Sequence, residues 1–381
     1  MCHFQLKANI TTAMIHSQLQ TIETQANCMI SDYFQLYANC ILVKGKKYSL
    51  IQDLQKGAYY RFETNYYYLI KSLELTSILE FTKKNNLNYK ELIDFLNIFV
   101  GNDLAHFTNY PKQFPKIGKS TSTPFNIHDS IIEWSKHNFD QMKFILINLT
   151  EVGCQNIEVR NLSKSNINSF LIFLKKINTT RIRGVELIIE YNKEFTHEYL
   201  SNLLKSYPII TKIVIHNVNS LAAQKNETSI IYYIEKKLEN NDCGTINKNL
   251  FKVNLSFYLE SLKHNNCLHK KISIDKNGNL FNCPSSNLKL GNIKNDKIIT
   301  VVNKENYKML SNISKSKIET CEYCEYRYVC SDCRIFIENP ENQFSKPLKC
   351  GYDPLTGNWE DWSKNQCKIK TFDIICNKLK K

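Results

Sequence analysis

The chain has 381 residues, of which 43% are hydrophobic, and its 50 Lys and Arg against 36 Asp and Glu give a net charge of +14. This length predicts two or three domains, and the hydrophobic content excludes a disordered chain. No apolar run approaches the ~20 residues of a membrane span, and the first residues lack the pattern of a secretory signal. We therefore expect a cytoplasmic protein whose 14 cysteines are metal ligands or catalytic thiols rather than disulfides.

The positive charge is compatible with nucleic-acid binding or with attraction for an acidic peptide. However, the lysines are scattered, Arg is scarce, and Asn, Ile and Tyr are abundant along the whole chain. This pattern is typical of the codon bias of an AT-rich genome. We therefore expect neither nucleic acid nor a membrane among the partners.

The N-terminal third divides into an extension and a small folded unit. Residues 1–36 carry no strong pattern at their start, and we assign them to an N-terminal extension. Within residues 37–108, the runs CILVKG and KKYSLI predict short strands separated by a turn at Gly45, and NYYYLIKSLEL and YKELIDFLNIFVG predict helices. Strands before helices in a segment of this length are typical of a winged-helix fold.

The middle of the chain predicts alternating strands and helices. Residues 109–125 collect three of the eight prolines and form a linker. Across residues 126–255, strand-like runs such as NIEVRNL and GVELIIEY alternate with helix-like runs such as SNINSFLIFLKKI. This order predicts an α/β fold with a parallel sheet, either open or a partial βα barrel, because the segment is too short for eight units.

Cysteines dominate residues 256–381. The sequence places Cys267 and Cys283 around Gly278, then a C-x2-C-x5-C-x2-C series, and then a last cysteine. The full set is Cys267, Cys283, Cys321, Cys324, Cys330, Cys333 and Cys350. Pairs spaced by two residues can direct both thiolates at one centre, and seven ligands exceed one four-coordinate ion, so two centres are implied. Spacing alone leaves zinc and iron–sulfur clusters equally open.

This series resembles the SPASM domain of radical S-adenosylmethionine peptide maturases. The stretches KISIDKNGNLFNCPS, LGNI, CEYCEYRYVCSDCR and YDPLTGNW, with YANCILVKG near the front, are similar to one subgroup, the grasp-with-spasm system SPASM-domain peptide maturases. Residues 37–108 resemble the PqqD-like precursor-recognition element of such enzymes, which binds a leader peptide as an added strand.

The resemblance implies two auxiliary 4Fe-4S clusters. One would be held by Cys321, Cys324, Cys330 and Cys350. The other would be held by Cys267, Cys283 and Cys333, with a fourth ligand unassigned. The family commonly has three residues before its sixth cysteine, whereas only Ser331 and Asp332 precede Cys333 here.

Residues 126–255 lack two motifs that the resemblance leads us to expect. A radical enzyme needs a C-x3-C-x2-C motif after the first barrel strand, and the corresponding loop here, SKHNFD (135–140), contains no cysteine. The glycine-rich turn expected after the second strand is replaced by NIEVRNLSKS. We therefore expect a degenerate radical-enzyme-like βα barrel that does not cleave S-adenosylmethionine in the usual way.

Several residues are further candidates for the missing ligand. Cys243 lies in a loop near the cysteine series, and Cys367 and Cys376 follow it, although the helical pattern around Cys376 favours a core thiol. His264 and His269 flank Cys267, but we expect surface imidazoles. No catalytic residue is assigned.

Two functional hypotheses follow from the resemblance. The first is maturation of a ribosomally synthesised peptide of the graspetide type, with a short precursor peptide and an ATP-grasp ligase as partners. The second is a non-catalytic adaptor that delivers the precursor to the ligase and holds structural metal, either iron–sulfur or zinc. The loss of the cofactor motifs favours the adaptor, and retention of all seven cysteines favours a redox or ligand-binding role.

Overall fold

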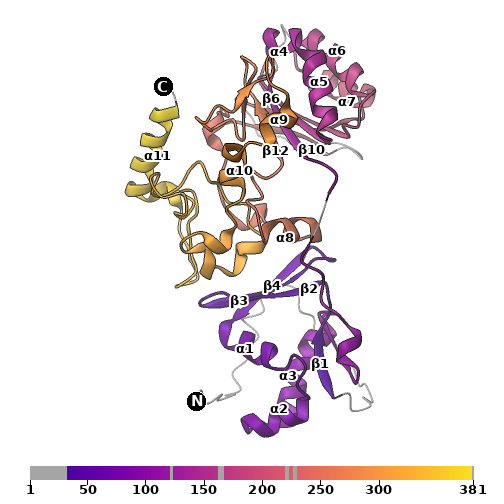
Figure 1. Cartoon of the computed structure of the whole chain (residues 1–381), viewed down its shortest axis with the longest axis vertical. Helices are drawn as coiled ribbons and strands as arrows, with labels where there is room; N and C mark the ends of the chain where they lie inside the picture. Colours follow the sequence, from indigo (N-terminus) through magenta and orange to yellow (C-terminus); the bar gives the residue numbers. More distant parts are fainter. Residues whose placement is uncertain (1–31, 121–122, 162–166, 219–222, 226–229, 380–381) are drawn as a thin grey trace.

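The computed structural model describes residues 32–120, 123–161, 167–218, 223–225 and 230–379. The molecule is elongated (Figure 1). An N-terminal unit lies at one end, a large sheet with its helices lies at the other, and the C-terminal residues lie between them. In the described part of the chain, no helix is both long and apolar enough to cross a membrane.

The N-terminal unit combines two small sheets with three helices. Its elements are β1 (Tyr33–Leu36), β2 (Cys40–Val43), β3 (Tyr48–Asp53), β4 (Ala58–Glu63), α1 (Thr64–Ser72), α2 (Ile78–Asn85), α3 (Tyr89–Gly101) and β5 (Ala105–Thr108). The strands β2, β3 and β4 form an antiparallel sheet in chain order, and the helices pack on it through buried side chains such as Ile51, Leu73 and Leu92.

Side-chain caps explain where two of these helices begin. The Ser77 hydroxyl accepts a hydrogen bond from the Glu80 amide at the start of α2, and Asn88 accepts bonds from the first amides of α3. Such caps satisfy amide donors that have no partner within the helix. The predicted strands and helices of this unit are therefore present.

The predicted boundary at residue 36 falls directly after strand β1. Strand β1 lies within the assigned extension, yet it pairs antiparallel with β5 across the whole of both strands. Phe34 is buried there and packs against Phe99 and Phe107. The pairing joins residues about 70 positions apart, so local pattern alone does not reveal it.

The alternating region forms most of an open, mainly parallel sheet. Its elements are β6 (Asp129–Glu133), α4 (Lys136–Asp140), α5 (Met142–Glu151), β7 (Asn156–Arg160), α6 (Ile167–Ile177), β8 (Gly184–Glu190), α7 (His197–Ser206), β9 (Ile210–His216), β10 (Ala223–Lys225) and β11 (Ile230–Ile234). The strand order is β10-β11-β9-β8-β7-β6-β12-β13-β14, and β11 through β12 run parallel. Since β10 and β14 are the two ends of this order among the described strands, the sheet is open.

The two faces of this sheet differ in chemistry. Ile157 and Val159 of β7 and Leu187 of β8 belong to the buried core beneath the helices. Their neighbours along the same strands are charged, with Glu158 and Arg160 on the opposite face. The helices therefore cover one face of the sheet (Figure 1), and charged side chains such as Glu158 and Arg160 lie on the other.

The C-terminal residues contribute three strands to the same sheet and then continue in short elements. These elements are α8 (Leu255–Ser261), β12 (Lys271–Ile274), β13 (Asn279–Phe281), β14 (Gly291–Asn292), α9 (Ile298–Val302), α10 (Glu305–Ser311), β15 (Tyr352–Asp353), β16 (Asn358–Trp359) and α11 (Gln366–Leu379). Since β12 pairs parallel with β6, the predicted division at residues 255 and 256 does not separate two independent sheets.

The N-terminal unit packs directly on the C-terminal residues. Val43 and Leu50 share a buried cluster with Tyr326, Val329 and Tyr352. The predicted turn glycine, Gly45, lies at this contact, where a Cβ atom would stand 2.9 Å from the Cβ of Glu325. Only a residue without a side chain allows the two parts to approach so closely.

Candidate metal centres

Four of the seven predicted cysteine ligands line one cavity. They are Cys321, Cys324, Cys330 and Cys350. Cys321 begins a short 3-10 turn, and the Cys324 amide donates to the Cys321 carbonyl at 3.0 Å, so the tight turn expected from C-x2-C spacing is present. We call these four residues the Cys350 quartet.

The half-buried Cys350 quartet lies beside fixed positive charge. Burial raises the pKa of Cys324 and of Cys330, and neighbouring cysteines raise both further. Lys315 and Arg334 both pair with Asp332, and their side chains are at most 1% exposed. Two cations for one carboxylate leave a net positive charge, which favours thiolate ligands at this site.

A second group of four thiols includes a cysteine that the sequence left as a minor candidate. The Cys283 thiol donates a hydrogen bond to Cys243, and Cys267 and Cys333 add their electrostatic effect on Cys283. The four come from separate segments: Cys243 follows the 3-10 turn at Asn240–Asp242, Cys267 follows α8, Cys283 follows β13, and Cys333 closes the C-x2-C pair. We call these four residues the Cys243 quartet.

Cys243 has the character of a ligand. The hydrogen bond from Cys283, with smaller effects of Ser285, Lys349 and Arg160, outweighs burial and lowers the pKa of Cys243 to about 6. In contrast, burial together with the charges of Cys267 and Cys243 raises the pKa of Cys333 to about 12. Cys243 therefore ionises more readily than Cys333. Sequence spacing alone did not rank it above Cys367 and Cys376, because it stands outside the C-x2-C pattern.

A glycine keeps the space around the Cys243 quartet open. Gly244 has a φ of +82°, and a Cβ atom there would lie 3.0 Å from the Cβ and 3.1 Å from the Sγ of Cys333. A cavity of about 140 Å³ lies alongside and is lined by Cys267 and Cys333 among others. A larger residue at position 244 would fill this space and strain the backbone.

Lys271 provides an independent test of whether a negatively charged group fits the Cys243 quartet. This lysine of β12 has a raised pKa, caused first by the charge of Cys267 and then by that of Cys283. In the described part of the chain, its ammonium forms no ion pair with a carboxylate. Asp129 and Glu158 also favour the charged form of this half-buried lysine, and an anionic thiolate centre beside it fits the same positive charge.

A single zinc ion and an iron–sulfur cluster require different distances between their cysteine ligands. Tetrahedral zinc holds its sulfurs at about 2.3 Å, so that neighbouring thiolates nearly touch. Among the described residues, no three His, Cys, Asp or Glu side chains converge in a way that holds one metal ion. A 4Fe-4S cluster has four irons and four sulfides between its cysteine ligands and requires a wider quartet. The thiol donors of both quartets suit either kind of centre.

The two quartets are adjacent. Their cavities share Ile246, Phe251, Cys330 and Asp332 as lining residues. The short segment Cys330–Cys333 also contributes one cysteine to each quartet. Any groups held by the two quartets are thus separated by little more than this segment.

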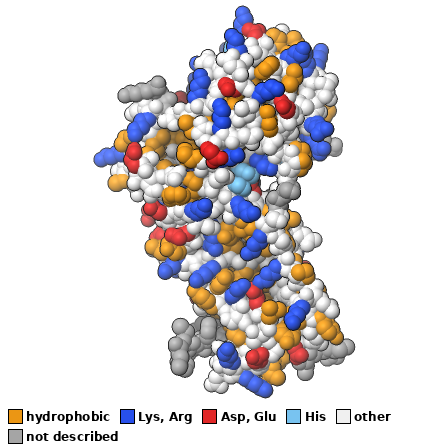
Figure 2. Space-filling view, in the orientation of Figure 1, with side chains coloured by type: hydrophobic (Ala, Val, Ile, Leu, Met, Phe, Trp, Pro, Cys, Tyr) orange, Lys and Arg blue, Asp and Glu red, His pale blue; other side chains and the backbone are white. Residues whose placement is uncertain are grey.

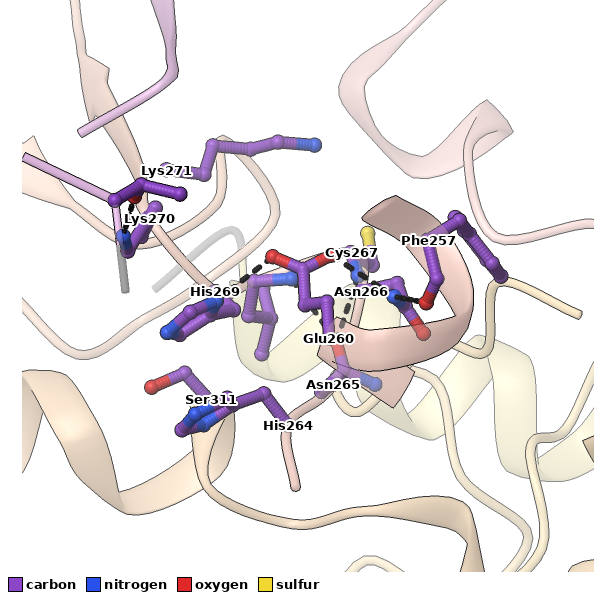
Figure 3. Close-up of polar contacts among 12 residues, drawn as sticks. Phe257, Glu260, His264, Asn265, Asn266, Cys267, His269, Lys270, Lys271 and Ser311 are labelled. Carbon is purple, nitrogen blue, oxygen red and sulfur yellow. Dashed lines mark hydrogen bonds and ion pairs between the residues drawn. The ribbon is translucent and has the colours of Figure 1, made fainter. Parts of the chain in front are cut away.

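The loop that carries Cys267 is fixed by hydrogen bonds, and the nearby histidines do not join the quartet. Asn265 accepts from the Cys267 amide at 3.1 Å and donates to the Asp332 carbonyl at 3.1 Å. His264 and His269 stack with ring centroids 3.8 Å apart, and His269 contacts Glu260 at 2.7 Å. In Figure 3 the Cys267 sulfur points away from both rings. The histidines are half-buried rather than at the surface as predicted.

The remaining candidate ligands occupy different environments. Cys367 is exposed at the start of α11. Cys376, further along α11, is packed in a hydrophobic cluster with Cys243, Cys333 and Phe336. Cys376 is therefore a thiol of the core next to the Cys243 quartet, in agreement with the expectation from its helical pattern.

The loop that lacks the three cysteines forms helix α4. The Ser135 hydroxyl accepts from the Asn138 amide, which caps this helix. The buried Asn138 side chain donates to the carbonyls of Glu133 at 2.7 Å and of Asp275 at 2.8 Å. Asn138 thereby ties the end of β6 to the turn after β12.

Comparison with known proteins agrees with the cysteine-rich region. A SPASM domain, described as an iron–sulfur cluster-binding domain, is found at residues 267–325. This match covers two cysteines of the Cys243 quartet, Cys267 and Cys283, and two of the Cys350 quartet, Cys321 and Cys324. A search of curated proteins found no matching relative.

Proposed function

We propose that this protein takes part in the maturation of a ribosomally synthesised peptide and holds two 4Fe-4S clusters in the Cys350 and Cys243 quartets. The observation that carries the proposal is the presence of two complete sets of four thiols beside fixed positive charge. A 4Fe-4S cluster held by four thiolates supplies one-electron chemistry.

The residues around the quartets support the two bound clusters. Lys315 and Arg334 supply a net positive charge beside the Cys350 quartet, and Lys271 does so beside the Cys243 quartet. Cys283 and Cys333 are buried, and the other thiols of the two quartets are half-buried. The positive charges favour anionic clusters at these sites.

The polar face of the large sheet supports a cradle for a substrate. It carries paired charges, with Glu158 contacting Arg160 and Glu186 contacting Lys212 at 3.4 Å. Arg160 also donates to Asn240 at 2.9 Å, and Asn240 leads into the turn before Cys243. The Cys243 quartet therefore lies beside this face, where a peptide on the sheet would be close to it.

A groove in the N-terminal unit supports peptide recognition. It has a volume of about 600 Å³, and β2, which is the outer strand of its sheet, lines part of it. An edge strand offers unpaired backbone groups, which an extended peptide can bind as an added strand. The apolar lining includes Phe114 and Pro115 of the linker, so side chains of the peptide would also find packing partners.

The charges around this groove favour an acidic peptide. Its lining includes Lys71, Lys112, Lys116 and Lys119, with Glu74 as the single acidic residue among them. Glu74 is already paired with Lys71 and Lys116. In Figure 2, Lys and Arg are spread over the visible face with Asp and Glu among them, so the attraction we propose is local to the groove.

An adaptor that delivers the precursor to an ATP-grasp ligase is the second candidate function. It is favoured by helix α4, which fills the place of a cluster-binding loop with the contacts of Asn138. The adaptor shares the peptide groove with the first proposal but needs no chemistry at the clusters.

One experiment separates these two functions. Precursor peptide and ligase are incubated with the reduced, cluster-loaded chain or without it, and the product masses are compared. A mass change beyond the water losses caused by the ligase supports the maturase and excludes the adaptor. A higher yield of the same products supports the adaptor, and the absence of any effect on mass or yield contradicts both.

A further inference from the structure

Lys349 is a buried lysine whose ammonium contacts the Cys243 loop. The residue is 2% exposed. Its Nζ atom donates to the carbonyl of Asn241 at 2.5 Å and to the carbonyl of Cys243 at 2.8 Å. Neither carbonyl belongs to a regular helix or strand, so the lysine supplies the hydrogen bonds that fix this turn.

Aromatic rings enclose the same ammonium. Nζ lies 4.5 Å from the ring centre of Phe336, 4.8 Å from that of Phe372 and 5.5 Å from that of Trp362. Contacts of this kind stabilise a cation that has lost its water. Phe372 belongs to α11, and therefore the C-terminal helix helps to hold Lys349 against the Cys243 loop.

The ammonium has no carboxylate to neutralise it. In the described part of the chain, Lys349 forms no ion pair with Asp or Glu, and burial lowers its pKa overall. Cys243 and Cys333 oppose this shift, as does Asp242, which is itself paired with Lys236. A cation kept in this way has an electrostatic effect on whatever the quartet binds.

Lys368 occupies a matching position at the other quartet. Its Nζ atom donates to the carbonyl of Cys350 at 2.7 Å. Unlike Lys349, it also pairs with a carboxylate, Glu338, at 2.8 Å. Each quartet therefore has one lysine that binds the backbone carbonyl of one of its own cysteines, but only the lysine at the Cys243 quartet keeps an uncompensated charge.

We propose that Lys349 is the positioning residue of the Cys243 centre: it holds Cys243 in place as the fourth ligand and sets the reduction potential of the bound cluster. The proposal rests on the proposed binding of a cluster by the Cys243 quartet. An uncompensated positive charge stabilises the more negative, reduced cluster and so raises its potential. Lys349 precedes Cys350 in the chain, so the same peptide segment supports both centres.

The test uses the full-length chain, purified without oxygen, with Lys349→Met and the matched variant Lys368→Met. Methionine keeps the length and the packing among the aromatic rings but removes the charge and the hydrogen bonds. Iron release to a chelator and redox titration followed by electron paramagnetic resonance are measured. The spectra of Cys243→Ser and Cys350→Ser assign each signal to its centre.

We expect Lys349→Met to lower the potential of the Cys243 centre and to speed its iron release, with the Cys350 centre unchanged. Lys368→Met should affect the Cys350 centre instead, with a smaller shift because Glu338 already offsets its charge. Unchanged behaviour of the Cys243 centre in Lys349→Met, or equal changes at both centres, would overturn the role of Lys349. Cluster binding itself is judged separately, because Cys243→Ser must lose iron whatever Lys349 does.

Discussion

At the scale of single residues, Cys243 has the largest effect on how the cysteine-rich region is understood. Without it, the Cys243 quartet has three thiols and a bound cluster has an open iron. With it, the quartet is complete, and the pKa of Cys243 is lowered to about 6. We therefore expect Cys243 to be essential for one cluster and irrelevant to the other.

The substitution Cys243→Ser tests this expectation through metal content. It should lower the iron content of the anaerobically purified chain from about eight to about four per molecule, because one 4Fe-4S cluster loses a ligand. Iron and sulfide analysis provides the measurement. Cys367→Ser is the matched control, since Cys367 is exposed on α11, and it should keep all the iron. Equal iron in wild type and Cys243→Ser would remove Cys243 from the ligand set.

Several residues could be predicted from the sequence, and others could not. The C-x2-C spacing predicts Cys321, Cys324, Cys330 and Cys333 as metal ligands because both members of each pair lie close together in the sequence. Cys243 and Lys349 act through contacts about 100 residues apart along the chain. Such contacts depend on how the large sheet and the C-terminal segments pack together. A short sequence pattern does not predict this packing.

At the scale of elements, the contact between the N-terminal unit and the C-terminal residues is a small apolar core. Leu50 of β3 is fully buried within it, beside Tyr326 and Tyr352. A carboxyl group, Glu325, is buried at the same contact and accepts from the Tyr352 hydroxyl. The N-terminal unit is therefore held against the cysteine-rich region rather than attached only by a linker.

Truncation of Leu50 should weaken this contact measurably. Leu50→Ala should lower the free energy of unfolding by about 2–5 kcal/mol, the usual cost of a cavity at a fully buried leucine. Urea denaturation provides the measurement, with Leu79→Ala as control because Leu79 is 52% exposed. A loss for Leu50→Ala no larger than that for Leu79→Ala would show that β3 is not held at this contact.

Glu74 forms ion pairs with Lys71 and with Lys116, a residue of the linker beside the peptide groove. Burial raises the pKa of Glu74, but hydrogen bonds from Lys116 and Lys71 outweigh it and lower the pKa overall. The stability that Glu74 supplies is therefore complete above its unfolded pKa of about 4.3 and is lost as pH falls through the lower folded value.

The matching variant is Glu74→Gln. We expect it to lower the free energy of unfolding by less than about 1 kcal/mol near pH 7, because the pair is partly exposed. The difference from wild type, measured by urea denaturation, should stay constant from pH 8 to pH 6 and shrink in acid. A difference that grows in acid would contradict the sign of the shift.

At the scale of the whole molecule, the sequence predicted the order of the strands and helices better than the boundaries of the domains. Alternating patterns predicted the parallel strands from β6 to β9 because each pattern is local to one element. The pairing of β12 with β6 and of β1 with β5 joins distant segments, and each pairing crosses a predicted boundary. The absence of cysteine from residues 135–140 was visible at once, but its replacement by the buried contacts of Asn138 was not.

The arrangement of the parts places the peptide groove and the two quartets in one molecule. The groove lies in the N-terminal unit, and Tyr258 of α8 belongs to its lining, so it also borders on the C-terminal residues. A peptide bound there would extend toward the cysteine-rich region. If the groove binds the precursor, deletion of residues 33–108 should abolish binding of a fluorescent precursor peptide by the cluster-loaded chain. Retained binding would locate the peptide site elsewhere.

The central claim is that the protein holds two iron–sulfur clusters. Its most direct test is quantification of iron, acid-labile sulfide and zinc in the full-length chain purified without oxygen. The account predicts about eight irons and about eight sulfides per chain, with no stoichiometric zinc. About two zincs per chain with no sulfide would contradict it.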